Sequence, residues 1–255
     1  MLAVPYFLSP AEGISKCEAI AIQRGERLLL SLKTWVFGKP KKPKSPSLVS
    51  QWDRDNYLGI DATANIRGKI AVRSGDENAL VVGEKSKFSG TIVVSGNKNR
   101  ILIGSNVDFR GDILVKGDGQ TVSIGDHSTT VGVYILCQEG CDVSIGRRCM
   151  FSREIEVRTT DAHSVIDRST GNRLNKPASV AIGDHVWVGL GSIINKGSNI
   201  PADSIVGARS FVNGTFEEAG VILAGTPARV VKRNITWNRS RKANFTVEEM
   251  DSWRS

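Results

Sequence analysis

The 255-residue chain contains little cysteine, histidine or proline and has no long apolar run. Its 4 cysteines show no paired CxxC spacing, so we predict no zinc site, no other metal site and no disulfide framework. No apolar stretch reaches the roughly 18 residues of a membrane-spanning helix. Charges interrupt the first thirty residues, which argues against a signal peptide. We therefore expect a cytoplasmic protein, with peripheral association at the inner membrane as an alternative.

Positive charge exceeds negative charge and is concentrated in two stretches of the chain. The formal net charge is +8, and basic residues crowd the segment 39–44. A second basic group lies near the C-terminus, where no acidic residue occurs between Ala219 and Val247. Such charge suits an anionic partner. Nucleic acid is not expected as that partner, because the chain carries no zinc finger, RNP-like motif or convincing helix-turn-helix.

Glycine is abundant, at 26 residues, and it belongs to an internal repeat. The repeat has a period of six residues downstream and a longer period of 21 residues upstream. Small or aliphatic residues recur four positions after most of the repeating aliphatic ones. The downstream series is Ile182, Val188, Ile194, Ile200, Val206 and Val212, and the upstream series is Val82, Ile103, Ile124 and Ile145, each followed by glycine.

Neither a helix, which repeats near 3.6 residues, nor a simple strand, which repeats near 2, explains these periods. Six residues per side indicate a short strand followed by a turn, and three sides make one triangular coil. Stacked coils pair their strands in parallel and bury a continuous aliphatic column. We therefore predict an all-β solenoid, in which Cys149 points inward, rather than an accidental pattern in a mixed α/β chain.

The repeat fails at one place, where functional residues are often found. The series Ile145, Phe151 and Val157 predicts an aliphatic residue at position 163, but the chain has His163. The polar residues 164–179 then predict a loop extruded from the coil. The other two histidines, His127 and His185, follow equivalent glycines, and we expect both to face solvent at corners.

Three motifs in this order resemble a known family. They are RTTDAHSVID before the loop, IGDHVWVG after it and ILAGTPARVVKR near the end. The hexapeptide-repeat, acetyl-CoA-dependent O-acetyltransferases have similar motifs; this group includes maltose and galactoside acetyltransferases and enzymes that modify capsular polysaccharide. The resemblance covers roughly residues 80–235. It implies a left-handed parallel β-helix and a homotrimer with sites between neighbouring subunits.

The chain is predicted to have three parts. Residues 1–58 form an N-terminal cap or linker with helical or irregular structure, and residues 59–235 form the β-helix domain. Residues 236–255 form a tail with a short helix, for which Thr246 is the N-cap.

The resemblance implies roles for individual residues. His163 is the hypothetical general base, because a neutral imidazole can accept the proton of an attacking hydroxyl. Asp161 either orients His163 or is an ordinary turn residue, and Trp187 forms a wall of the acetyl site. Acetyl-CoA is the acyl donor, and the oxyanion contact must come from a backbone N–H near Leu190. The residues expected to contact the cofactor are Gly189, Leu190, Gly207, Ala208, Arg209, Gly225, Thr226, Arg229, Lys232 and Arg233.

The acceptor is expected to be a sugar hydroxyl of a bacterial capsular or other surface polysaccharide. Three alternatives are open. One is N-acyl transfer to an amino-sugar nucleotide, and another is a non-catalytic β-helix scaffold. The third is a gamma-type zinc carbonic anhydrase, but Arg168 occupies the second position of the HxxxxH spacing that begins at His163.

Overall fold

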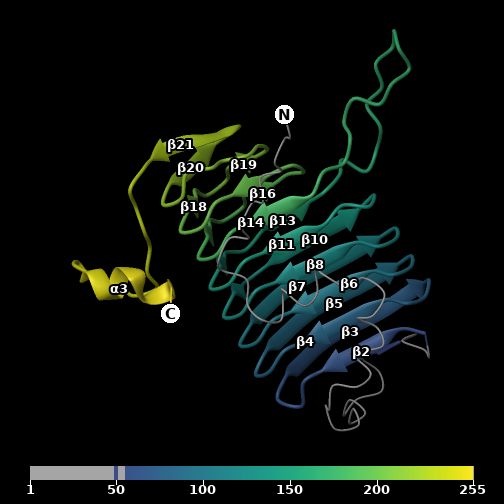
Figure 1. Cartoon of the computed structure of the whole chain (residues 1–255), viewed down its shortest axis with the longest axis horizontal. Coiled ribbons are helices and arrows are strands. Elements are labelled where there is room, and N and C mark those ends of the chain that lie inside the picture. The colour runs from purple at the N-terminus through teal and green to yellow at the C-terminus, as the bar shows by residue number, and fades with distance from the viewer. Residues whose placement is uncertain (1–48, 51–54, 255) are drawn as a thin grey trace, which may run out of the picture. The chain divides into compact units, whose positions relative to one another are not determined.

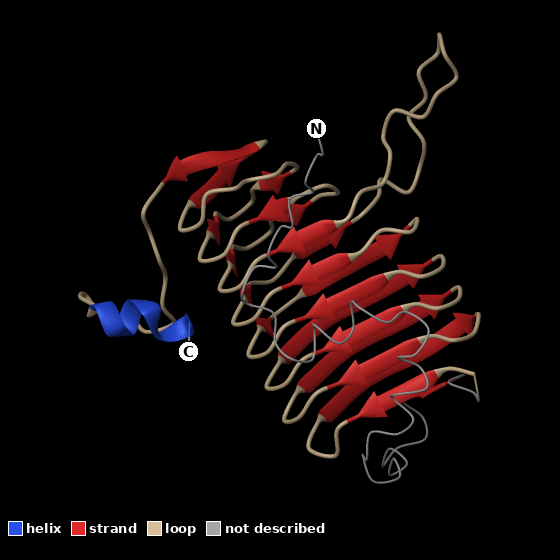
Figure 2. Ribbon diagram, viewed as in Figure 1, coloured by secondary structure: helices blue, strands red, loops and turns tan. Residues whose placement is uncertain are grey.

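The computed structural model describes residues 49–50 and 55–254 of the chain. Most of the predicted N-terminal segment, including the basic stretch 39–44, lies outside the described residues, so its role as a cap stays a prediction. Within the described part, strands stack as successive rungs and the one α-helix lies near the C-terminus (Figures 1 and 2).

One side of the stack is a parallel sheet of 7 strands, to which each coil contributes one strand. The strands pair in parallel in the order β17-β14-β11-β8-β6-β4-β2. Their bounds are β2 (Tyr57–Ile60), β4 (Ala79–Val82), β6 (Arg100–Ile103), β8 (Thr121–Ile124), β11 (Val143–Ile145), β14 (Val180–Ile182) and β17 (Asn199–Ile200).

The other two sides form a bent sheet of 14 strands. In the first coils one long strand covers both sides, and in later coils two short strands do so. The long strands are β3 (Asn65–Ser74), β5 (Lys87–Ser95) and β7 (Asp108–Lys116), and β1 (Val49–Ser50) pairs with β3. The short strands are β9 (Thr129–Thr130), β10 (Val133–Gln138), β12 (Met150–Phe151), β13 (Ile155–Arg158), β15 (Trp187–Val188), β16 (Ile193–Ile194), β18 (Ile205–Val206) and β19 (Phe211–Val212).

The last coil ends in an antiparallel hairpin of β20 (Ile222–Gly225) and β21 (Ala228–Lys232). The tail then forms α3 (Val247–Asp251), followed by a 3-10 turn η1 (Ser252–Arg254). Thr246 is the N-cap of α3, as predicted, and it forms a capping box with Glu249.

The core is the predicted aliphatic column. Residues at the repeating position are buried, as are the small residues four positions later, among them Ser192, Ser204 and Cys149. The prediction of an all-β solenoid made of stacked parallel coils is therefore confirmed, including the inward direction of Cys149.

Each coil has three corners, which we number along the chain. In the coil that starts at β14, corner 1 is Gly183–His185, corner 2 is Gly189–Gly191 and corner 3 is Asn195–Ser198. The extra three residues of each upstream coil lie at corner 3, where a buried ladder joins Asn78, Asn99 and Gln120. The Asn99 amide donates to Asn78 Oδ1 at 3.0 Å, and the Gln120 N–H donates to Asn99 Oδ1 at 3.0 Å.

The predicted extruded loop leaves the stack at corner 3, between β13 of one coil and β14 of the next. It projects as a long excursion at the upper right of Figure 1 and contains one antiparallel bridge, between Ile166 and Arg173. The loop is therefore held in a defined shape. Among the described residues no helix is long and apolar enough to span a membrane.

Stacked glycines turn the long strands at corner 2. Gly68, Gly90 and Gly111 have φ of 137°, 145° and 147°, in the region that only glycine occupies readily. A Cβ on Gly90 would lie 1.8 Å from the carbonyl oxygen of Gly111. The backbone of each coil therefore occupies the space that a side chain at this corner would need.

We predict that Gly90→Ala destabilises the solenoid by about 2 kcal/mol or more, through backbone strain and this contact. Urea unfolding of the full chain measures the change. Gly214→Ala is the matched control, because no described atom lies within 4 Å of its Cβ position, and it should change stability by less than about 0.5 kcal/mol. Equal stability of the two variants would contradict the prediction.

Candidate active site

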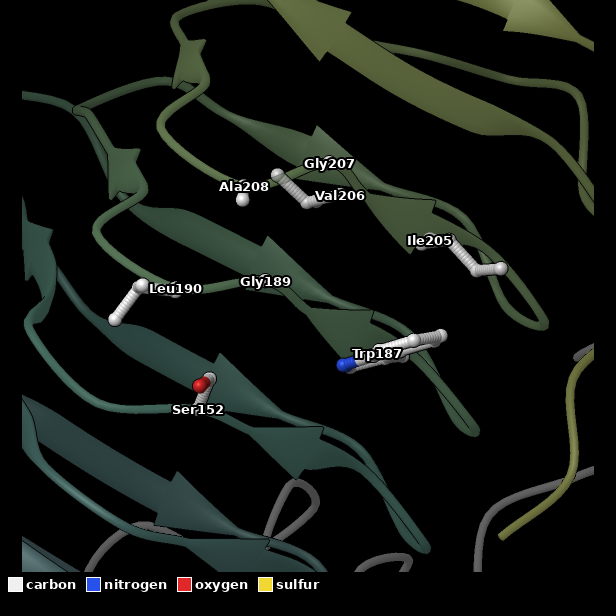
Figure 3. Close-up of a pocket in the computed structure, with 8 residues that line it drawn as sticks. All are labelled: Ser152, Trp187, Gly189, Leu190, Ile205, Val206, Gly207 and Ala208. Atoms are coloured by element: carbon white, nitrogen blue, oxygen red, sulfur yellow. The ribbon is translucent and has the colours of Figure 1, made fainter. Parts of the chain in front are cut away.

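A cavity of about 380 Å³ lies at corner 2, between three successive coils (Figure 3). We call it the corner 2 cavity. Trp187 stands at one end, and the backbone of two neighbouring corners forms the floor. The lining residues are Ser152, Trp187, Gly189, Leu190, Ile205, Val206, Gly207 and Ala208.

Two glycines let the coils approach each other below this cavity. A Cβ on Gly189 would lie 2.7 Å from the Ala208 nitrogen, and a Cβ on Gly207 would lie 3.0 Å from the Ala224 Cβ. The N–H groups of both glycines donate to the next coil, at 2.8 Å in each case. Among the hydrogen bonds between described residues, however, the N–H groups of Leu190 and Ala208 find no acceptor. The cavity therefore has an apolar wall, and two of its lining residues, Leu190 and Ala208, have unused backbone donors.

Trp187 projects outward because it alternates with inward-facing neighbours. Val186 and Val188 are fully buried, whereas 38% of Trp187 is exposed. Strand β15 holds it in register with Met150 on one side and Ile205 on the other. Its ring also lies 6.1 Å from that of Trp237, at an interplanar angle of 48°. The indole is thus both a cavity wall and a contact for the tail.

Four of the ten predicted cofactor residues line the corner 2 cavity: Gly189, Leu190, Gly207 and Ala208. The other six, which come later in the chain, do not. Arg209 turns back at the corner with φ of 56°, and the N–H of Gly225 donates to Ser210 Oγ at 3.1 Å. Thr226 and Arg229 lie at the β20–β21 hairpin, and Arg233 pairs with Glu218 at 2.8 Å. A cofactor role for Arg209, Gly225, Thr226, Arg229, Lys232 and Arg233 stays a prediction.

His163 is exposed at the base of the extruded loop, on corner 3. Asn175, from the returning arm of the loop, donates from Nδ2 to the His163 carbonyl oxygen at 2.8 Å and to Asp161 Oδ2 at 2.8 Å. Asp161 also accepts a bond from Lys196 Nζ. Its carboxylate is therefore used by Lys196 and Asn175 and not by the imidazole, and any influence on His163 passes through the backbone.

Two carboxylates anchor the loop to the stack. The bonds from Lys196 and then Asn175 lower the pKa of Asp161. Bonds from Arg173 and Thr160 lower the pKa of Glu139, which accepts from Arg173 Nη2 at 3.2 Å. Both arms of the loop are thus tied to residues of the solenoid.

Cys137 and Cys149 are poor nucleophiles in this fold. Burial raises the pKa of Cys149 and of Cys137 to about 12 in each case. The thiolate form is therefore scarce at neutral pH. Among residues 49–50 and 55–254, no three His, Cys, Asp or Glu side chains lie close enough together to hold a metal ion.

The prediction for His185 is wrong, whereas that for His127 is confirmed. His127 is exposed at corner 1 of its coil, but His185 is only 6% exposed at the equivalent corner. His185 is covered by residues 234–254, which we call the C-terminal strap. Its ring stacks on Trp237 at 4.2 Å and on Trp253 at 4.7 Å. The local motif is the same at both corners, so the difference comes from residues distant in the sequence, namely the strap and Asp203 of the next coil.

Sequence analysis missed two other features of the site. Ser152 and Ile205 line the corner 2 cavity, and the coil period could have found them, because each lies next to a repeating core position. Lys196 binds Asp161 across the base of the loop. No spacing in the sequence relates those two residues, because the loop between them has no period.

Comparison with known proteins finds related acetyltransferases. The chain is 30% identical over 104 residues to a polysialic acid O-acetyltransferase of Escherichia coli O1:K1 (APEC), a match of 41% of this chain and 34% of that protein. It is 31% identical over 94 residues to a polysialic acid O-acetyltransferase of Neisseria meningitidis, or 37% of this chain and 44% of that one. The matches thus cover less than half the length of these curated relatives. No family model matches the chain.

Two solved structures share the fold more completely. The polysialic acid O-acetyltransferase OatWY superposes with a TM-score of 0.66 at 26% identity, over 77% of this chain and 93% of that one. The polySia-specific acetyltransferase NeuO superposes with a TM-score of 0.53 at 26% identity, over 75% and 92%. The resemblance to hexapeptide-repeat O-acetyltransferases is therefore confirmed.

We predict that the loop loosens at low pH. A carboxylate with a lowered pKa in the folded state stabilises that state above its unfolded pKa of about 4 and loses this contribution as the pH falls through the folded value. Glu139 and Asp161 should therefore hold the loop at pH 6 and release it as the pH falls below the unfolded value of about 4 and through the lowered folded values. Hydrogen exchange followed by mass spectrometry, corrected for intrinsic rates, should detect lost protection at Val165 and Leu174, whose N–H groups are bonded within the loop.

Peptides from β5 and β7 serve as the internal reference in that experiment, because their protection reports on the whole stack. Glu139→Gln should lower loop protection at pH 6 and reduce its pH dependence. Unchanged loop protection at pH 2.5 in the parent chain would contradict the prediction.

Proposed function

We propose that the protein transfers an acetyl group from acetyl-CoA to a hydroxyl of an anionic bacterial surface polysaccharide. The observation that carries the proposal is the corner 2 cavity, with its tryptophan wall and two unused backbone donors, in a fold shared with two polysialic acid O-acetyltransferases. The acceptors of those relatives are polymers of negatively charged sugars, which makes a polyanionic acceptor the first candidate for this chain.

The donor fits the shape and chemistry of the cavity. The pantetheine arm of acetyl-CoA is long, narrow and rich in amide groups, and a slot between coils matches it. The N–H groups of Leu190 and Ala208 can donate to its carbonyl oxygens or to the oxyanion that forms on the thioester. Trp187 then closes the end of the slot beside the acetyl group.

His163 supplies the base in this proposal. The acceptor hydroxyl attacks the thioester carbonyl carbon, and its proton passes to an imidazole nitrogen of His163. The tetrahedral intermediate collapses by breaking the carbon–sulfur bond, and the imidazolium returns the proton to the CoA sulfur. Atoms and charge balance without a covalent enzyme intermediate. The high pKa of the Cys149 and Cys137 thiols, about 12, also argues against a cysteine nucleophile.

Charge near His163 favours an anionic acceptor. The extruded loop exposes Arg168 and Lys176, and the whole chain carries a net charge of +8. Long-range attraction of this kind concentrates a polyanion at the loop and weakens as salt is added. An uncharged sugar would gain nothing from it.

The site is assembled between copies of the chain in a homotrimer. Within one chain, His163 stands at corner 3 and the cavity at corner 2, separated by a side of about six residues, or ~20 Å at ~3.3 Å per residue. A closed threefold ring brings different surfaces of neighbouring copies together and can place one copy's corner 3 beside the next copy's corner 2. The exposed loop residues Val165, Ile166 and Leu174 supply an apolar contact for such a neighbour.

The test of the function is an acceptor panel with labelled acetyl-CoA. The panel contains polysialic acid, other acidic capsular polymers, a neutral polysaccharide, free small sugars and an amino-sugar nucleotide. We expect ester formation on an acidic polymer, located by NMR, and inhibition by salt. Amide formation on the nucleotide would replace the proposal by N-acyl transfer, and no transfer to any acceptor would refute it.

His163→Ala should lower turnover by at least ~10²-fold while acetyl-CoA binding is retained, because the imidazole serves proton transfer and not donor binding. His127→Ala is the matched control, since it removes an exposed histidine from a coil corner outside the site. Equal turnover in the two variants would show that another group removes the proton.

Complementation tests the shared site. Ala208→Leu should block the corner 2 cavity and inactivate the trimer, as His163→Ala does through the base. When the two variants are co-expressed in equal amounts, about a quarter of the sites of a randomly mixed trimer combine an intact histidine with an intact cavity. We expect that fraction of the parent activity. Activity no higher than that of either variant alone would place both parts of the site in one chain.

A further inference from the structure

His185 is a buried ionisable side chain two residues before Trp187. Its Nδ1 lies 2.8 Å from Asp203 Oδ1, a residue of corner 1 in the next coil. The rings of Trp237 and Trp253 are parallel to it within 7° and 8°, so one indole must stack on each of its faces. An imidazole so enclosed is fixed in both position and orientation.

The C-terminal strap is attached around this histidine by polar bonds. Trp237 Nε1 donates to the His185 carbonyl oxygen at 2.7 Å, and Thr236 Oγ1 donates to Asp203 Oδ1 at 2.7 Å. Farther along, Arg239 donates to Thr129 Oγ1 at 2.9 Å and to the Cys149 carbonyl oxygen at 3.2 Å. The strap thus crosses the coils of β18, β15, β12 and β9, outside the regular repeat.

His127 provides an internal comparison. Both histidines follow the same Ile-Gly-Asp sequence, and both have left-handed backbone, with φ of 61° at His127 and 55° at His185. His127 is exposed and contacts no aromatic ring of the described chain. Asn106 and Arg148 have the same left-handed backbone at corner 1 of other coils, with φ of 56° and 57°. The corner therefore does not require histidine for its backbone shape, and we look for the reason for the enclosure of His185 in its contacts.

The strap residue Trp237 connects His185 to the corner 2 cavity. Trp237 lies between His185 and Trp187, stacked on the first and tilted at 48° against the second. Arg239 places its guanidinium carbon 5.8 Å from the centre of the Trp237 ring. Trp187 therefore meets the cavity on one side and the anchored strap on the other.

We infer that His185 is a positioning residue: with Asp203, it anchors the C-terminal strap, and through Trp237 the strap fixes the indole of Trp187 at the acetyl end of the cavity. This inference rests on the proposed function, because it assigns the indole to an acetyl site. It gives the tail, which lies outside the repeat, a direct part in the reaction.

The experiment compares full-length His185→Asn with His127→Asn. Asparagine tolerates left-handed backbone, so neither corner is strained, but it cannot stack between two indoles. Near-UV circular dichroism reports the packing of the indoles, and tryptophan fluorescence during titration with acetyl-CoA gives the donor affinity. Thermal unfolding shows whether each variant keeps the folded solenoid. Turnover is measured on the acceptor that the acceptor panel identifies.

For His185→Asn we expect an altered near-UV spectrum, donor affinity weakened about 5-fold or more and kcat lowered about 10-fold or more, because a misplaced wall disturbs the alignment of the reactants. His127→Asn should match the parent chain in every measurement. Arg239→Met removes a contact of the strap and leaves the histidine in place, and it should change the same quantities in the same direction. If His185→Asn does not fold, the Arg239→Met variant tests the inference in its place.

An altered spectrum with donor affinity and kcat equal to those of the parent would overturn the inference, because the packing of the strap would then have no effect on the acetyl site. An unchanged spectrum would overturn it as well. Failure of the proposed function is detected by a separate measurement, the acetyl transfer activity of the parent chain. If the parent binds acetyl-CoA but transfers acetyl to no acceptor, the donor affinities of the variants still decide the role of His185.

Discussion

The structure depends on one constraint: each residue of a coil lies directly above its counterpart in the coil before, at the spacing of about 4.8 Å that backbone hydrogen bonds set. A residue is accommodated at a position only if its side chain can stack on the same or a similar side chain in the neighbouring coil. Aliphatic side chains satisfy this in the core, and amide side chains do so in the ladder of Asn78, Asn99 and Gln120. Glycine satisfies it at corner 2, where the backbone itself fills the space.

Because stacking repeats one local environment, the sequence reveals much of the fold. The inward positions, the parallel coils, the extruded loop and the capped helix were all predicted from period and local motifs. Four residues that were expected to contact the cofactor, Gly189, Leu190, Gly207 and Ala208, line the cavity, and they occupy equivalent corners of adjacent coils. Prediction failed where two distant segments meet without a period, as when the strap covers His185 some fifty residues earlier in the chain.

The three corners divide the work of the proposed site. Corner 2 offers a slot with unused N–H groups, corner 3 carries His163 on an anchored loop, and corner 1 anchors the strap at His185. A single triangular coil cannot bring its own corners together, because its core fills the space between them. Residues that are fixed on different corners can therefore cooperate only through another copy of the chain or through a segment that leaves the coil.

The two segments that leave the stack meet it at neighbouring coils. The extruded loop is inserted before β14, and the strap covers His185 immediately after that strand. The same strand and corner arrangement recurs along the solenoid, so a regular repeat by itself would give many equivalent positions and no single one of them an advantage. The insertion and the strap break that equivalence at one coil. In the site that we propose there, the repeat supplies the groove, the insertion supplies the base and the strap fixes the wall. Specificity for one reaction therefore requires departures from the repeat that makes the fold stable.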